Sequence, residues 1–258
     1  KETHRGPIIS ETHPFNFVYN KDEQKTPPIS MRWSGNEFSD EMLAFYKINK
    51  AKNWNEFRDA VKYFGIPGQN FVYGDAQGNI GYIMGARIPL RNSNNPTLVF
   101  DGTSSENDWK GFVPADEIPA ILNPAENFIA SANNKAIKNF KYHISNLWEP
   151  SSRIDRISEL ITSKEKQSVS DFKKYQMDQV SPYAKTIVPY ILKSFEGIKV
   201  KDKNLNISLD LLDKWDFELN KYSQTSAIYS VFLKYLLKNI YHDEMGDDLY
   251  NRFVFLAN

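Results

Sequence analysis

Two adjacent asparagines, Asn133 and Asn134, follow a short apolar run in the segment FIASANNKAI, residues 128–137. The apolar and small residues 128–132 predict a buried strand, which would place both carboxamides at its end. Two interpretations remain open. A side-chain carbonyl could cap backbone donors and close a turn. Alternatively, a rigidly held side-chain NH₂ could donate a hydrogen bond to a carbonyl oxygen that gains negative charge during acyl transfer.

Arg153 is a second candidate for chemistry. It lies near the start of SSRIDRISELITS, residues 151–163, whose apolar residues at helical spacing predict a helix. The helix dipole disfavours a cation in the first turn, and Arg156 follows three residues later, as on a solvated helix surface. A functional arginine here would have to be held by carboxylates or contact a substrate.

Composition and spacing disfavour several other kinds of site. The absence of cysteine excludes disulfides, thiolate metal sites and a cysteine nucleophile. The four histidines lack metal-ligand spacing, and no GxSxG motif marks a serine nucleophile. A calcium-binding loop built on Asp75, Gln77 and Asn79 would lack the turn glycine and the distal glutamate of such loops. We therefore expect ordinary surface or core histidines, with a Ser-His-Asp triad as the open alternative.

Charge and hydropathy exclude two classes of partner. The 32 Lys and Arg residues balance the 32 Asp and Glu residues, so the chain lacks the basic surface that binds nucleic acid or anionic lipid. No stretch approaches the roughly 20 apolar residues that span a membrane. We expect neither a nucleic-acid partner nor a membrane span.

The elements that must position these residues differ along the chain. Before about residue 150, short β-rich runs alternate with Pro, Gly and Asn turns and predict strands. These runs are PIIS (7–10), FNFVYN (15–20), ISMRW (29–33), NFVYGD (70–75), NIGYIMG (79–85) and TLVF (97–100). A helical insertion at 39–65 interrupts them, with Ser39 as the expected cap of its first helix.

The runs on either side of AQGN, residues 76–79, predict a hairpin in which Gly78 adopts a positive φ. After residue 150 capped helices dominate, including SVSDFKKYQMD (168–178) and a helix at 223–240, with an exposed connection at 196–206. The sequence thus predicts an α+β fold with a β-rich part at 1–150 and a mainly helical part at 151–258. Its length suffices for a sizeable core.

The two ends predict a piece of a larger precursor. The chain begins with Lys1 and enters an apolar run within a few residues, and it stops just after the apolar run FVFLA. Any targeting information would then lie outside this segment.

Four longer segments carry a specific resemblance: AKNWNEF (51–57), NFVYGDAQGNIGY (70–82), DWKGFVPADEIPAILNPAENFIASANNK (108–135) and LWEPSSRIDRISELI (147–161). With THRGPIIS (3–10) and a looser match through SAIYSVFLKYLL (226–237), they cover most of the chain. Together they resemble the penicillin acylase (penicillin amidase) family of N-terminal-nucleophile (Ntn) amidohydrolases. The resemblance implies part of an αββα sandwich followed by a mainly helical portion.

The resemblance also implies a reaction. In that family a precursor cuts itself, and the serine that becomes the first residue of the large chain attacks an amide while its own α-amine serves as base. THRGPIIS lies well downstream of that serine in family members, so the nucleophile would lie outside this chain. The partners would be a small-molecule amide and the remaining parts of the precursor, namely the small chain and the start of the large chain. This segment alone would be inactive.

Site residues follow from matching positions. The resemblance implies that Asn133, the first asparagine of the ANN motif, is the oxyanion-hole donor and that Asn134 supports the turn. It implies that Arg153 orients the active-site asparagine and the nucleophile region. Phe45 falls where the family places an aromatic side chain in the acyl-binding pocket, although a large apolar residue on a helix is by default core.

Calcium is the one metal that the resemblance raises, and the expected reaction requires no cofactor. Pro96 would lend its backbone carbonyl, while Tyr142 stands where some members have a ligating aspartate. Most ligands would come from parts outside this chain. Arg5 stands where many members have histidine. Calcium binding therefore stays an open alternative.

Two rival functions remain. A same-fold rival is an acylase acting on N-acyl homoserine lactones or other lipidic amides, which would need a longer and narrower acyl pocket. A rival of another class is a non-catalytic scaffold or binding module. Because family members are commonly exported, the resemblance implies an extracytoplasmic location.

Overall fold

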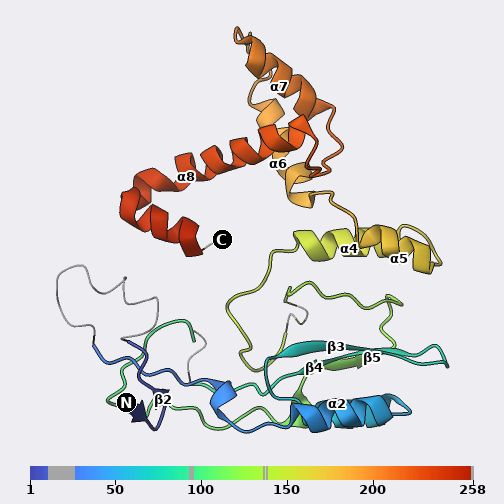
Figure 1. Ribbon diagram of the computed structural model, residues 1–258, viewed down its shortest axis with the longest axis vertical. Coiled ribbons are helices and arrows are strands. Elements are labelled where there is room, and N and C mark those ends of the chain that lie inside the picture. The colour runs from blue at the N-terminus through green and yellow to red at the C-terminus, as the bar shows by residue number, and fades with distance from the viewer. Residues whose placement is uncertain (11–26, 93–95, 136, 138, 257–258) are drawn as a thin grey trace. The chain divides into compact units, whose positions relative to one another are not determined.

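The computed structural model describes residues 1–10, 27–92, 96–135, 137 and 139–256 of the chain. The chain divides into two compact units, Lys1–Glu149 and Pro150–Asn258. The first contains small sheets and two α-helices, and the elements described in the second are all helices (Figure 1). The predicted α+β fold class is confirmed.

An antiparallel sheet lies at the centre of the first unit. Its strands are β3 (Gln69–Gly74), β4 (Ile80–Gly85) and β5 (Ala120–Leu122), with β4 in the middle. Asn70 pairs with Met84, and Val72 pairs with Tyr82. Side chains of directly paired residues share one face of a sheet, so these four side chains lie on the same face.

The hairpin between β3 and β4 is confirmed. Asp75 closes its turn, because one carboxylate oxygen accepts hydrogen bonds from the backbone N–H groups of Gln77 and Asn79 at 3.0 and 2.9 Å. Gly78 has a φ of 88°, which glycine adopts at no steric cost.

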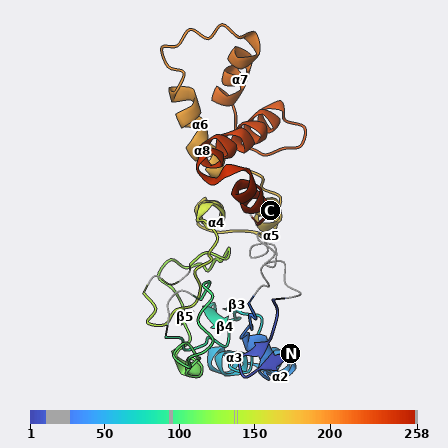
Figure 2. The ribbon, with the colours of Figure 1, turned by 90° about the vertical axis from the view of Figure 1, so that its left-hand side faces the viewer.

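Two helices, α2 (Glu41–Lys50) and α3 (Trp54–Val61), lie against the other face of this sheet, as Figures 1 and 2 both show. Phe57 and Val61 of α3 form a buried cluster with Tyr73 and Ile83 of the hairpin. A Cβ atom at Gly81 would lie 2.4 Å from the ring of Trp54. Only glycine therefore allows α3 to approach β4 this closely.

The expected cap of α2 is wrong by one residue. Asp40, directly before the first helical residue, accepts the backbone N–H that the cap must satisfy. Ser39 instead donates its hydroxyl to the carboxylate of Glu41. That carboxylate also accepts the backbone N–H groups of Gly65 and Ile66, which ties the start of α2 to the chain beyond α3.

Residues 128–132 do not form the predicted buried strand. They lie between Asn127 and Asn133, whose φ angles of 58° and 60° turn the chain at each end. Among the five, only Ala132 is buried. The apolar composition predicted burial, but a strand also requires a neighbour with which its backbone groups pair, and the structure pairs this segment with no described strand.

Of the other predicted strands that the structure describes, one does not form and two form only in part. TLVF at 97–100 is irregular, so that prediction is wrong for the same reason. PIIS contributes to β2 (Gly6–Pro7), which pairs with β1 (Glu2–Thr3), and ISMRW contributes only a bridge between Ser30 and Ile8. FNFVYN at 15–20 lies outside the described residues. Short 3₁₀ turns occur at Ser34–Asn36 and Ala115–Glu117.

The helices of the second unit are α4 (Ser152–Thr162), α5 (Val169–Tyr175), α6 (Pro182–Lys193), α7 (Lys203–Asp213) and α8 (Gln224–Leu256). The predicted cap at Ser168 is confirmed as a capping box with Asp171. The last helix runs beyond the predicted 223–240 and bends at Gly246, whose φ is 68°.

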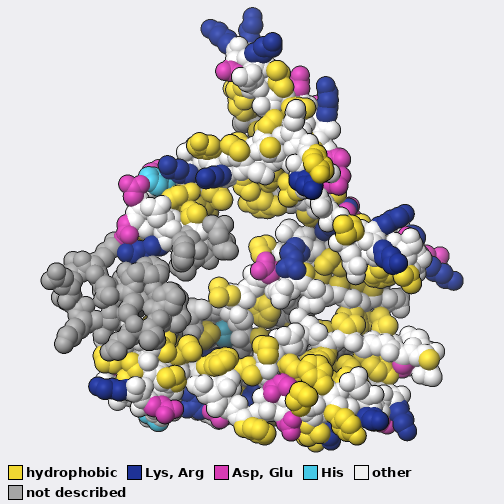
Figure 3. Space-filling model, viewed as in Figure 1, with side chains coloured by type: hydrophobic (Ala, Val, Ile, Leu, Met, Phe, Trp, Pro, Cys, Tyr) yellow, Lys and Arg dark blue, Asp and Glu magenta, His cyan; other side chains and the backbone are white. Residues whose placement is uncertain are grey.

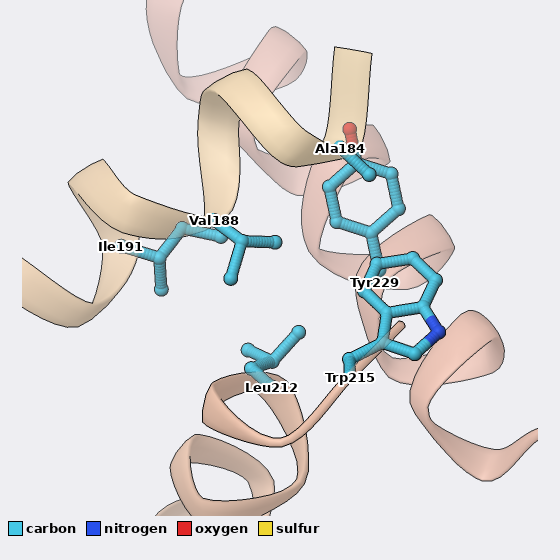
Figure 4. Packing of buried hydrophobic residues seen from close by; sticks show 6 residues of the cluster. All are labelled: Ala184, Val188, Ile191, Leu212, Trp215 and Tyr229. Carbon is cyan, nitrogen blue, oxygen red and sulfur yellow. The ribbon is translucent and has the colours of Figure 1, made fainter. Parts of the chain in front are cut away.

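A separate core holds this unit together. Three buried residues of α6 pack against one residue of α7, one of α8 and Trp215 between them (Figure 4). The cluster consists of Ala184, Val188, Ile191, Leu212, Trp215 and Tyr229. None of the described helices carries a stretch long and apolar enough to cross a membrane. Basic and acidic side chains occur over both units on the face in Figure 3.

Candidate active site

Asn133 occupies an anchored turn. The side-chain oxygen of Asn134 accepts a 3.0 Å hydrogen bond from the backbone N–H of Ala132. The carbonyl oxygen of Asn133 accepts another of 3.0 Å from the backbone N–H of Glu149. Ala132 is 3% exposed, whereas Asn133 is exposed. The turn is therefore fixed next to a buried residue and leaves Asn133 accessible on the first unit.

The backbone at Asn133 is left-handed, with a φ of 60°. Asparagine tolerates this region better than other residues with a side chain, glycine aside. Asn123 and Asn127 adopt similar φ angles of 52° and 58°. Asparagine at 133 thus has a conformational role that is compatible with a chemical one, while Asn134 takes the turn-supporting role.

A chain of side-chain hydrogen bonds joins this segment to the sheet. The hydroxyl of Tyr82 donates to Oδ1 of Asn70 at 2.6 Å, and Nδ2 of Asn70 donates to Oγ of Ser131 at 2.9 Å. Ser131 lies two residues before Asn133. Asn70 was not predicted as a site residue from the sequence, because a polar residue at the start of a strand is typical of a strand boundary. The available signal was the pairing register, which places Asn70 and Tyr82 on one face.

Phe45 lies on α2 within an aromatic group. Its ring centroid is 5.7 Å from that of Phe64 and 6.4 Å from that of Phe71, and the residue is 47% exposed. Phe71 directly follows Asn70 on β3, so their side chains point to opposite faces. The structure therefore brings Phe45 and the segment bearing Asn133 to the same end of β3, on opposite faces of the sheet.

Two cavities of the first unit lie elsewhere. The larger, about 640 Å³, is lined mainly by charged residues of α2 and α3 and by those that follow them, including Lys47, Lys50, Glu56, Asp59 and Lys62. The smaller, about 170 Å³, is lined by residues such as Phe64, Met84 and Phe112. Neither includes Phe45 or Asn133. A cavity lined by so many charges does not suit an apolar acyl group.

Arg153 and Arg156 differ in their surroundings. Arg153 is an exposed residue in the first turn of α4. Arg156 binds both carboxylate oxygens of Asp178, at 2.8 and 2.5 Å, and pairs with Glu159 at 2.8 Å. This pairing raises the pKa of Arg156 and lowers the pKa of Asp178. Arg156 is therefore structural, and the role of Arg153, which belongs to the second unit, stays a prediction.

The surroundings of Tyr142 do not fit a calcium ion. The hydroxyl of Tyr142 donates to a carboxylate oxygen of Glu117 at 2.9 Å. Lys141 forms an ion pair with that same carboxylate and, with Tyr142, lowers the pKa of Glu117. Within the part of the chain that the structure describes, no three His, Cys, Asp or Glu side chains could together hold a metal ion. A single backbone carbonyl, that of Pro96, is a weak ligand set for calcium.

The contacts of the Arg5 guanidinium give this residue a structural role. Its Nε donates to Asp108 at 2.5 Å, its Nη1 donates to the carbonyl oxygen of Gly102 at 2.5 Å, and its Nη2 donates to the carbonyl oxygen of Ser104. The Arg5 guanidinium lowers the pKa of Asp108. The planar guanidinium thus fastens the start of the chain to the loop at 102–108.

Curated relatives support the fold and the family. The chain is 25% identical over 92% of its length to penicillin acylase 2 proenzyme of Pseudomonas sp. (strain SE83). It is 29% identical over 86% of its length to acyl-homoserine lactone acylase QuiP of Pseudomonas syringae pv. tomato, and 28% identical over 81% to penicillin G acylase of Escherichia coli. The chain spans only 29%, 29% and 26% of these three proteins.

A solved structure shows the same fold. Thermostable penicillin G acylase from Alcaligenes faecalis matches 95% of this chain, and 45% of its own chain, with a TM-score of 0.71 and 22% identity. The family model of penicillin amidase matches residues 1–257. Since this match extends over nearly the whole sequence, the chain belongs to the penicillin amidase family.

Proposed function

We propose that this chain is the middle portion of an amide hydrolase of the penicillin acylase type. In this proposal Asn133 donates a hydrogen bond to the oxyanion that forms when an N-terminal serine, encoded outside this chain, attacks the substrate. The observation that carries the proposal is the anchored, accessible turn at Asn133. Membership of the family supports it.

The reaction needs a hydrogen-bond donor that is in place before the serine oxygen bonds to the amide carbon. The serine oxygen adds to the amide carbon, and the carbonyl oxygen becomes an alkoxide. The serine proton passes through the α-amine to the leaving amine, and water then hydrolyses the acyl ester. A donor fixed in advance requires no reorganisation at that moment, and its loss lowers kcat by about 10²–10³-fold. Arg153 acts as a positioning residue.

The aromatic group around Phe45 favours an apolar or aromatic acyl group. The half-exposed ring of Phe45 packs against Phe71 and against the buried Phe64, so it offers an apolar contact. Hydrolysis of the amide bond of an N-acyl homoserine lactone is a second candidate activity, favoured by the similarity to the relatives named acyl-homoserine lactone acylase. The two candidates differ in the length of acyl chain that the site accepts.

The test uses the complete gene product that contains this chain. Chromogenic phenylacetyl and long-chain acyl amides, together with an N-acyl homoserine lactone, give kcat for the wild type, Asn133→Asp and Asn127→Gly. Asn133→Asp keeps the size of the side chain but lacks the donor, so kcat falls by about 10²–10³-fold. Asn127→Gly is the control, because Asn127 has nearly the same φ and is also exposed.

The outcomes separate the rival functions. Turnover limited to the lactones and long-chain amides selects the second candidate. Absence of turnover by the complete protein on every substrate selects a scaffold or binding module. Full activity of Asn133→Asp removes Asn133 from the mechanism. The isolated chain of residues 1–258 shows no turnover, because the proposed nucleophile lies elsewhere.

A further inference from the structure

Asn70 lies on β3, and its side chain links the sheet to the segment that carries Asn133. We infer that Asn70 is a positioning residue for the oxyanion donor, because its carboxamide holds Ser131 to the central strand through Tyr82. This inference rests on the proposed function. It adds a residue 63 positions before Asn133 in the sequence (133 minus 70) to the apparatus of that site.

Tyr82 supplies the fixed point, that is, the buried residue of the central strand to which the side chain of Asn70 is hydrogen-bonded. It lies on β4, which pairs with β3 on one side and β5 on the other, and it is 7% exposed. Burial raises the pKa of Tyr82, so its hydroxyl keeps its proton at neutral pH. The hydroxyl donates to Oδ1 of Asn70 at 2.6 Å. The other end of the carboxamide, Nδ2, then donates to Oγ of Ser131 at 2.9 Å.

Ala132 connects Ser131, which Asn70 holds, to Asn133. It lies between Ser131 and Asn133, is 3% exposed, and has its backbone N–H bonded to Asn134. The backbone N–H of Ala132 donates to Asn134, and the backbone N–H of Glu149 donates to Asn133; both bonds join parts of one irregular segment, so they shape the turn. The bond from Asn70 to Ser131 fastens that turn to the sheet.

A purely structural role for Asn70 predicts kinetics that differ from those of a positioning role. A positioning residue changes the geometry of the donor, so its loss lowers kcat while KM changes little. Displacement of a catalytic group by about 1 Å can cost as much as 10²-fold in rate. A structural residue would instead lower the amount of folded enzyme and leave kcat per folded molecule unchanged.

A double-mutant cycle in the complete gene product tests the inference. Asn70→Ala is expected to lower kcat about tenfold and to change KM less than about twofold. Asn133→Asp lowers kcat by about 10²–10³-fold. The double variant has the same kcat as Asn133→Asp alone, because Asn70 acts through Asn133 and the two effects are not additive.

Other outcomes are decisive in different ways. Multiplied effects in the double variant overturn the inference about Asn70 and leave the function of Asn133 intact. An unchanged kcat in Asn70→Ala also overturns the inference about Asn70 and leaves the function of Asn133 intact. Unchanged kcat in Asn133→Asp overturns the proposed function and the inference with it. Thus the failure of one is distinguishable from the failure of the other.

Matched tyrosines control for the loss of a hydroxyl. Tyr82→Phe removes the fixed point and lowers kcat in the same direction as Asn70→Ala. Tyr73→Phe removes a 2.9 Å bond to Asp75 in the hairpin turn of the same sheet and leaves kcat unchanged. Equal losses in the two variants overturn the inference. If Asn70→Ala does not fold, Ser131→Ala removes the same hydrogen bond from the other side and takes its place in the cycle.

Discussion

The side-chain oxygen of Asn134 accepts a 3.0 Å hydrogen bond from the backbone N–H of Ala132. The two adjacent asparagines therefore have opposite chemical requirements. Asn134 acts as an acceptor, whereas the proposed role of Asn133 requires a donor. A carboxylate accepts hydrogen bonds but cannot donate them, so substitution by aspartate distinguishes the two positions.

We expect Asn134→Asp to keep kcat within about threefold of the wild type, because the acceptor for the Ala132 N–H is retained. Asn134→Ala loses that acceptor and lowers kcat, because the turn at Asn133 is no longer fixed. Steady-state kinetics of the complete protein measures both. Comparable losses in Asn134→Asp and Asn133→Asp would contradict the assignment of acceptor and donor.

We expect Glu41 to make the stability of the first unit sensitive to acid. The Ser39 hydroxyl, with the backbone N–H groups of Ile66 and Gly65, lowers the pKa of Glu41 from 4.5 to about 2. A folded-state pKa below the unfolded value contributes stability above the unfolded pKa, and that contribution is lost as the pH falls from about 4.5 towards 2. Hydrogen exchange at the amides of residues 65 and 66 measures this.

In Glu41→Gln these amides are expected to exchange about fivefold faster than in the wild type at pH 7, because a charge-assisted hydrogen bond becomes a neutral one. Once intrinsic rates are corrected, the ratio approaches one near pH 2. Glu56→Gln is the control, since Glu56 bonds to Lys52 and Asn53 at the start of α3. A ratio that grows as the pH falls would refute the assignment.

The two arginines of α4 should respond differently to truncation. The side chains of Arg156 and Asp178 are only 17% and 18% exposed, so Arg156→Ala leaves a carboxylate without its partner. We expect a loss of about 2–3 kcal/mol in the stability of the second unit. Arg153 is exposed, so Arg153→Ala lowers the Tm less than Arg156→Ala does, and it lowers kcat. A comparable drop in Tm for both variants would make Arg153 structural.

The effect of Phe45 on KM should depend on the size of the acyl group of the substrate. Phe45→Ala removes an exposed ring, and we expect KM for a phenylacetyl amide to rise about fivefold, the scale of one aromatic contact. KM for an acetyl amide stays the same. Met42→Ala is the control on the same helix, because Met42 is 80% exposed. An equal rise for both substrates would exclude Phe45 from acyl recognition.

Much of the local structure was predictable because its causes are close together in the chain. Asp75 and Gly78 close the hairpin within five residues, and Ser168 and Asp171 cap α5 within four. The family likewise follows from motifs that are continuous in the sequence and matches residues 1–257. These signals also singled out Asn133 and Arg153, whose proposed roles the kinetic experiments test.

Only the tertiary structure decided which partners the side chains find. The apolar residues 128–132 looked like a strand, but the structure holds the end of this segment through Asn70, which is 61 residues before Ser131. Ser39 looked like a cap and binds Glu41 instead, because Gly65 and Ile66 bring further donors to that carboxylate. Hydrogen-bonding capacity is a property of each residue. The partner depends on which strand, turn or helix end the folded chain brings within about 3 Å.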